Sequence, residues 1–203
     1  ELEESNYAIS DLVADMSELA LQELADKDKS VKFFVELGEN VTDNLIGDVY
    51  KIRNILVRLL DNAIRYTKQG SITLSVDSYG YTDHAHQDML NIVFTIADTG
   101  IGIQEERLDN IFDLYESGDS MKNSTHPGHG VGLAIAKGYA DILDAELSVE
   151  SVYGAGSTFV LSLNQKPAVK LSSGQVVSKI EDTVSKEDAE KLWLPEVSAL
   201  LVD

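Results

Sequence analysis

Residues 48–70 read DVYKIRNILVRLLDNAIRYTKQG, and the apolar side chains of this stretch recur every three or four positions. The apolar set is Ile52, Ile55, Leu56, Leu59, Leu60, Ala63 and Ile64. That period matches a helical turn, so the stretch predicts an amphipathic helix from about Asp48 to Tyr66, with Gly70 ending it. A helix with one apolar face needs a sheet or further helices to cover that face.

On the C-terminal side of this helix, the apolar residues begin to recur at every second position. Ile72, Leu74 and Val76 alternate with polar residues, and a second alternating run covers 90–96. The polar segment 78–89 between the two runs predicts an antiparallel hairpin with a long tip. Alternation returns at 147–149 and 159–163, and the segment YGAGS joins these runs.

Further segments supply more helices and one more strand. Helical periodicity predicts helices over 11–25, 104–114 and 130–143, and SVKFFVEL at 30–37 predicts a strand. Helices on one side of a mostly antiparallel sheet make an α+β two-layer sandwich. We expect this domain to span 1–164. A polar linker is expected over 165–195, and the apolar run 196–203 is expected to open another domain.

The composition of the 203-residue chain narrows the class of protein. A formal net charge of −19 disfavours nucleic acid and anionic lipid as partners, because like charges repel. The absence of cysteine excludes a disulfide scaffold, a cysteine nucleophile and a thiolate zinc site. The sequence has neither a membrane-spanning apolar run nor a signal-peptide pattern. We therefore expect a cytoplasmic domain, whose parent protein can still be membrane-anchored.

The glycines of HPGHGVGLAIAK, at 126–137, alternate immediately before a predicted helix. Their G-x-G-x-G spacing fits neither the dinucleotide-binding G-x-G-x-x-G nor the P-loop G-x-x-x-x-G-K-[ST]. A glycine-rich turn before a helix N-terminus can still bind an anion such as phosphate through free backbone N–H groups. Taken alone, the stretch is equally compatible with a flexible loop that starts a helix.

Three other segments place polar or glycine residues where a site could form. Asp98 ends a strand and enters the turn DTGIG, where it could accept a hydrogen bond from an exocyclic amine or simply cap the turn. Asn62 lies at the edge of the apolar stripe of its helix. Its amide oxygen could ligate Mg²⁺ or simply be solvated. GAGSTF, at 154–159, by itself predicts only a hairpin turn.

In this order, the segments resemble the ATP-binding fold shared by histidine kinases, DNA gyrase, Hsp90 chaperones and MutL. RLLDNAIRYT is similar to the N box of the kinases, IADTGIGI to the G1 box and IFDLYES to the F box. HPGHGVGLAIAK is similar to the G2 box and GAGSTF to the G3 box. The resemblance covers roughly residues 5–164, and the F box and the NAIRYT form point to the histidine-kinase branch.

The resemblance implies a site for Mg²⁺ and ATP built from these boxes. Asn62 would hold Mg²⁺, Arg65 would contact phosphate, and Tyr66 would border the nucleotide. Asp98 would accept a hydrogen bond from the adenine amine, and Thr158 would support Asp98 through water.

The glycines have implied roles as well. Gly100 and Gly102 would let the base approach the backbone. The hinge of a lid and the start of the helix near the phosphates would comprise Gly128, Gly130, Gly132 and Leu133. Residues 115–129 would be the lid itself, which orders on ATP.

Two features depart from the histidine-kinase pattern. Arg58 stands one turn before Asn62, where histidine kinases usually carry Asn and the ATP-hydrolysing relatives carry Glu. Arginine stays protonated and cannot act as a general base. It could contact phosphate, impair Mg²⁺ binding, or point away into solvent. Lys122 is the only Lys or Arg of the lid, which disfavours vigorous phosphoryl transfer.

The implied function is donation of the γ-phosphate of Mg·ATP to a histidine on an adjacent dimerisation domain, in a two-component phosphorelay. The histidines of this chain lie in predicted loops, so the acceptor is expected elsewhere; they are His84, His86, His126 and His129. The tail 196–203 resembles the first strand of a receiver domain, which implies a hybrid sensor kinase. The resemblance to the kinases also implies that the parent protein is a homodimer. The alternatives are a degenerate nucleotide-binding relay module and, disfavoured by Arg58, an ATPase of the gyrase or Hsp90 kind.

Overall fold

The computed structural model describes residues 2–27, 30–82, 88–113 and 131–168. The helices are α1 (Ile9–Asp26), α2 (Val49–Tyr66), α3 (Glu105–Leu108) and α4 (Gly132–Ile142). The strands are β1 (Ser5–Ala8), β2 (Ser30–Leu37), β3 (Asn44–Gly47), β4 (Gln69–Thr82), β5 (Asp88–Asp98), β6 (Glu146–Val152) and β7 (Gly156–Pro167). The predicted lid, the receiver-like tail and nearly all of the predicted linker lie outside the described residues.

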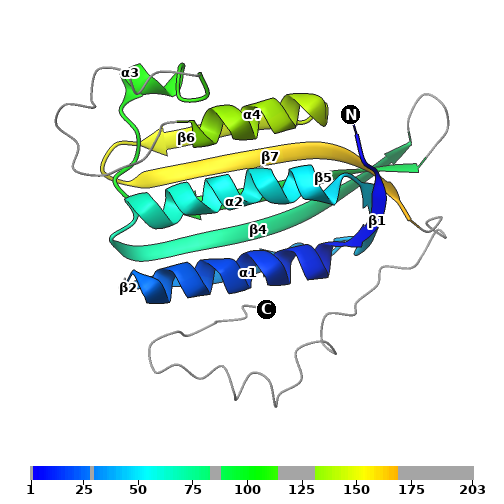
Figure 1. Ribbon diagram of the computed structural model, residues 1–203, viewed down its shortest axis with the longest axis horizontal. Coiled ribbons are helices and arrows are strands. Elements are labelled where there is room, and N and C mark those ends of the chain that lie inside the picture. The colour runs from blue at the N-terminus through cyan, green and yellow to red at the C-terminus, as the bar shows by residue number, and fades with distance from the viewer. Residues whose placement is uncertain (1, 28–29, 83–87, 114–130, 169–203) are drawn as a thin grey trace, which may run out of the picture.

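Within the described residues the strands form a 7-stranded sheet in the order β1-β3-β7-β5-β4-β2, with β6 also paired to β7. β2 and β4 run parallel, and every other pair is antiparallel. β6 and β3 share the edge of β7 opposite β5: β6 pairs with residues 156–162, and β3 with 166–167. With its helices on one face, this mostly antiparallel sheet confirms the predicted α+β sandwich (Figure 1).

α2 lies between α1 and α4 in the helical layer (Figure 1). It begins where the buried carboxylate of Asp48 accepts a hydrogen bond from the backbone N–H of Lys51. The pKa of the Lys51 amine is raised, first by its bond to Asp48 and to a smaller extent by Tyr139 of α4. Tyr139 therefore lies near the start of α2, and the two helices run antiparallel. No helix in the described part of the chain is long and apolar enough to cross a membrane.

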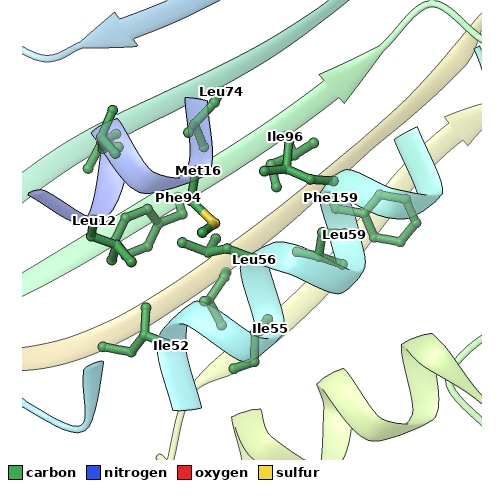
Figure 2. Close-up of a cluster of buried hydrophobic side chains, with 14 of the residues drawn as sticks. Leu12, Met16, Ile52, Ile55, Leu56, Leu59, Leu74, Phe94, Ile96 and Phe159 are labelled. Carbon is green, nitrogen blue, oxygen red and sulfur yellow. The ribbon is translucent and has the colours of Figure 1, made fainter. Parts of the chain in front are cut away.

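The apolar face of α2 forms the middle of the core. All of its predicted apolar positions are at most 1% exposed. Figure 2 shows this face against side chains of three strands and of α1. The labelled residues are Leu12, Met16, Ile52, Ile55, Leu56, Leu59, Leu74, Phe94, Ile96 and Phe159. Because this burial anchors α2 against β4, β5 and β7, the polar residues at its edges are held in defined positions.

The role of Gly70 and the tip of the hairpin differ from the prediction, whereas the end of α2 at Tyr66 agrees with it. α2 ends at Tyr66, and Thr67 is already extended, so Gly70 lies within β4 instead of closing the helix. β4 and β5 stay paired as far as Thr82 and Asp88, so most of the predicted loop 78–89 is strand. A backbone ladder needs no alternation of apolar side chains, which is why the polar ends of these strands read as a loop.

Three further boundaries also differ. The helix predicted over 104–114 is the single turn α3, followed by non-helical turns as far as residue 113. β1 and β3 were not predicted, because four residues are too few for a periodic signal. β7 runs to Pro167, beyond the predicted domain end at residue 164, because its last residues pair with β3.

Candidate functional site

Asp98 is the last residue of β5, and its side chain lies on the helix-covered face of the sheet, which it shares with buried Ile96. Its carboxylate accepts hydrogen bonds from the backbone N–H of Gly100 at 2.7 Å, from the backbone N–H of Ser157, and from the Thr67 hydroxyl at 3.5 Å. Burial raises the pKa of Asp98, although these three hydrogen bonds oppose the rise. A carboxylate has about four acceptor positions, so Asp98 retains capacity for one more donor.

The loop after Asp98 packs tightly between the end of α2 and the turn that joins β6 to β7. A Cβ atom on Gly100 would lie 2.6 Å from the Tyr66 carbonyl oxygen and 2.7 Å from Asp98 Oδ1, so a side chain does not fit there. The backbone N–H of Ile101 donates to the Tyr66 carbonyl, and the Ile101 carbonyl accepts from Gly154. Gly102 lies against Val152. Both predicted glycines of this loop therefore stand at close backbone contacts.

A cavity of about 300 Å³ opens beside this loop. Its lining includes Tyr66 at the end of α2, Lys68, Gly100 and Tyr153 of the β6–β7 turn. Tyr66 is 49% exposed, so its ring is free to contact a bound group. A second cavity, of about 320 Å³, is lined by Glu36, Asp77 and residues beside them on the opposite face of the sheet. None of the predicted site residues lines it, and its carboxylates disfavour an anionic ligand.

Asn62 and Arg58 lie on the side of α2 that faces α4. Arg53 marks the α1 side, because it forms an ion pair with Asp15 of α1. Asn62 is about 180° from Arg53 around the helix, and Arg58 about 140°. Arg58 is partly exposed, and its Nε atom is buried, so part of its side chain lies against the protein. Arg65 is exposed and pairs with Asp61 at 2.9 Å.

α4 begins at Gly132 without a side-chain cap, and Leu133 packs against the core. Since α4 runs antiparallel to α2, its start lies beside the C-terminal half of α2, on the side of Asn62. Uncapped N–H groups at a helix start favour an anion. Gly128 and Gly130 lie outside the described residues, as do the four histidines.

The assignment of Thr158 as the support of Asp98 is wrong, and Ser157 takes its place. The sheet register pairs Asp98 with Ser157 and Ala97 with Thr158, so Thr158 points to the opposite face. Ser157 also exchanges a hydrogen bond with Ser151 at 3.0 Å, and Ser151 accepts from the backbone of Ile103. The sequence could have shown this, because Ser157 lies two residues before Phe159 and therefore on the same face of the strand, whereas Thr158 does not. No motif or periodic pattern in the sequence indicated that Thr67 would contact Asp98.

Comparisons with known proteins agree with this geometry. Residues 47–167 match the family model "Histidine kinase-, DNA gyrase B-, and HSP90-like ATPase". The chain is 32% identical over 153 residues to the peroxide stress-activated histidine kinase mak2 of Schizosaccharomyces pombe, covering 75% of this chain and 6% of that protein. It is 29% identical to the aerobic respiration control sensor protein ArcB of Escherichia coli, covering 100% of this chain and 24% of that protein. The chain thus spans at most about a quarter of these relatives.

Solved structures show the same fold at low sequence identity. Full-length ShkA in complex with AMPPNP aligns with a TM-score of 0.66 at 21% identity, covering 83% of this chain and 32% of that one. The nucleotide-free catalytic domain of histidine kinase ThkA aligns with a TM-score of 0.60 at 20% identity, covering 81% of this chain and 99% of that domain. The arrangement of helices and sheet is therefore that of histidine-kinase catalytic domains.

Proposed function

This chain belongs to the histidine kinase-, DNA gyrase B-, and HSP90-like ATPase family, and we propose that it binds Mg·ATP and donates the γ-phosphate to a histidine on an adjacent dimerisation domain. The observation that carries the proposal is the half-buried carboxylate of Asp98, held by three hydrogen bonds and with acceptor capacity left over. An adenine amine is a donor of the kind such a carboxylate accepts. The ShkA structure, similar in fold, was solved with the ATP analogue AMPPNP.

The residues along α2 fit a triphosphate and its metal ion. Asn62 is half-exposed, and its side chain makes no hydrogen bond within the described residues, so its amide oxygen is available to a hard cation. Bound Mg²⁺ would neutralise charge on the phosphates. Arg58 is partly exposed, and its buried Nε atom has no hydrogen bond within the described residues, so this side chain offers further positive charge to an anionic oxygen. Arg65 and Tyr66 stand at the C-terminal end of the same helix, and Tyr66 lines the cavity.

The role of the chain in the reaction is to position ATP and to stabilise charge, without covalent chemistry of its own. Arg58 cannot deprotonate water, which supports transfer to a histidine over the hydrolysis of gyrase-like or Hsp90-like proteins. The acceptor histidine is proposed to lie on a dimerisation domain of the same homodimeric protein, in the cytoplasm.

The parts of the chain beyond the described residues complete the proposal. We place the catalytic domain at 1–164, with its last strand continuing to Pro167, then a linker to residue 195 and the start of a receiver domain at 196–203. The parent would then be a hybrid sensor kinase of a two-component phosphorelay.

A nucleotide-binding relay module without phosphoryl transfer is the second candidate. The specific observation in its favour is Arg58, a cation where the kinase pattern carries Asn. In this reading, nucleotide binding changes how the chain contacts its neighbours, and no phosphate moves.

Phosphate transfer separates the two candidates. The purified chain is mixed with γ-labelled ATP, Mg²⁺ and the dimerisation domain of its parent protein, and label on histidine is followed over time. We expect acid-labile label on that domain and none on this chain. ATP binding without any label would favour the relay module, and the absence of ATP binding would contradict both.

The raised pKa of Asp98 predicts opposite effects of pH on stability and on ATP binding. The folded chain binds the Asp98 proton more tightly than the unfolded chain, in which an aspartate has a pKa of about 3.9. As the pH rises from that value through the higher folded pKa, the contribution of Asp98 to the free energy of unfolding decreases. ATP affinity increases over the same range, because the adenine amine needs an ionised carboxylate.

Chemical denaturation and calorimetric ATP titrations at several pH values would measure both trends. The Asp98→Asn variant is the reference for stability, since it cannot titrate at this position. An ATP affinity that stays constant while Asp98 titrates would contradict its assignment to the amine.

A further inference from the structure

Arg58 carries a buried guanidinium nitrogen that the described part of the chain leaves without a partner. Its Nε atom is buried and has no hydrogen bond there. Arg58 also forms no ion pair with any residue of 2–27, 30–82, 88–113 or 131–168. Buried donors in native proteins almost always have a partner. The residue as a whole is partly exposed, so this permanent cation can still meet an anionic ligand from the solvent side.

The other cations of α2 and α4 are neutralised, which makes Arg58 an exception within the described residues. The pairs are Lys51 with Asp48, Arg53 with Asp15, Arg65 with Asp61, and Lys137 with Asp141. Each of these carboxylates lowers the attraction of its cation for an incoming anion. In a chain with a net charge of −19, an unneutralised guanidinium is a strong local attraction for phosphate.

The position of Arg58 along α2 indicates which phosphate of a bound nucleotide would lie nearest to it. Asp98 lies near the C-terminal end of α2, where the loop after it contacts the Tyr66 carbonyl. A nucleotide with its base at Asp98 that extends along the α4 side of α2 meets Asn62 first. It meets Arg58 about 6 Å further toward the helix start, at a rise of about 1.5 Å per residue. The outermost phosphate is therefore the one nearest Arg58.

We infer that Arg58 binds the terminal phosphate of ATP and so enables this chain to distinguish ATP from ADP without Mg²⁺. The inference rests on the proposed function, because it takes ATP as the ligand. The guanidinium presents a planar set of donors that matches phosphate oxygens and remains charged at every working pH. Neither the Asn nor the Glu of the related sequences offers a positive charge at this position.

Calorimetric titrations with ATP and with ADP, each in EDTA and in Mg²⁺, test the inference on the full chain. In EDTA, Arg58→Met is expected to weaken ATP binding roughly 10- to 100-fold, the size of a lost charge-assisted contact, and ADP binding much less. With Mg²⁺ the loss of ATP affinity should be smaller, because the metal ion supplies charge. Arg58→Lys keeps a point charge and should recover part of the affinity.

The matched control is Arg53→Met on the same helix, which removes an arginine facing α1 and should change neither affinity. Thermal unfolding without nucleotide distinguishes binding from structure: Arg58→Met deletes an unsatisfied buried donor and should leave the melting temperature unchanged or higher. A lower melting temperature with equal losses for ATP and ADP would overturn the inference and make Arg58 structural.

Two further outcomes keep the inference separate from the proposed function. If wild type binds ATP, Asp98→Asn does not, and Arg58→Met matches wild type for both nucleotides, the inference fails and the function stands. If wild type binds no nucleotide in either condition, both fail. Should Arg58→Met not fold, Arg58→Gln replaces it with the same criteria.

Discussion

Asp98→Asn is expected to weaken ATP binding on the order of a hundredfold, the cost of losing a hydrogen bond to a charged group. Asparagine can keep an oxygen toward the N–H of Gly100, 2.7 Å away in the native site. Its amide group then brings N–H donors to the position where the carboxylate would accept from adenine. Two opposed donors cannot form a hydrogen bond, so binding is lost while the fold is retained. Calorimetry with ATP measures the change.

Asp77→Asn is the matched control for this substitution. Asp77 is also half-buried and on a central strand, but it lies on the face of the sheet opposite Asp98. We expect Asp77→Asn to bind ATP as wild type does, and both variants to keep the wild-type circular dichroism spectrum. Equal ATP affinity in wild type and Asp98→Asn would remove the adenine assignment.

Gly156→Ala is expected to destabilise the domain by about 2–5 kcal/mol. Gly156 has φ +122°, where an L side chain is strained by roughly 1–2 kcal/mol. The added Cβ would also lie 1.9 Å from the backbone carbonyl oxygen of Asp98, and overpacking of this kind costs about 1–3 kcal/mol more. The carbonyl of Asp98 can move away from the added Cβ only if β5 and β7 separate where Asp98 pairs with Ser157. Denaturant unfolding measures the loss, and ATP affinity should fall with it.

Gly154→Ala separates backbone strain from the steric clash. Gly154 has φ +88° in the same turn, but nothing lies within 4 Å of the Cβ that alanine would add. This variant should therefore carry only the strain, roughly 1–2 kcal/mol, and bind ATP nearly as wild type does. Equal destabilisation by the two alanines would show that contact with Asp98 is not what requires glycine at 156.

The elements that were predicted well are those in which a periodic apolar pattern coincides with burial. α2 was predicted almost to the residue, since each of its apolar positions packs on the sheet and Asp48 caps its start. The β4–β5 hairpin was found for the same reason, although its length was not. The ends of β4 and β5 are held by backbone hydrogen bonds, which side-chain patterns do not report. β1 and β3 do bury Tyr7 and Leu45, but four residues are too few to show a period.

The residues of the candidate site also fall into those that the sequence could predict and those that it could not. Asp98, Gly100 and Asn62 could be proposed from motif and spacing, and the structure places Asp98 and Gly100 in direct contact. Thr158 was wrong because the choice between neighbouring strand residues depends on register, which only the pairing with β5 settles. The buried Nε of Arg58 could not be predicted, because it depends on how α2 packs in the folded domain.

The sequence by itself determined which faces of the helices and strands are buried, and it placed a carboxylate and glycines at the end of a strand. These follow from local rules: side chains repeat every 3.6 residues on a helix and every two on a strand. Only the tertiary structure decided that Ser157 and Thr67 hold Asp98, and that Arg58 has no ion pair within the described residues while the other cations of its helix have one. Such contacts join residues far apart in the chain, and their geometry depends on how strands align and helices pack.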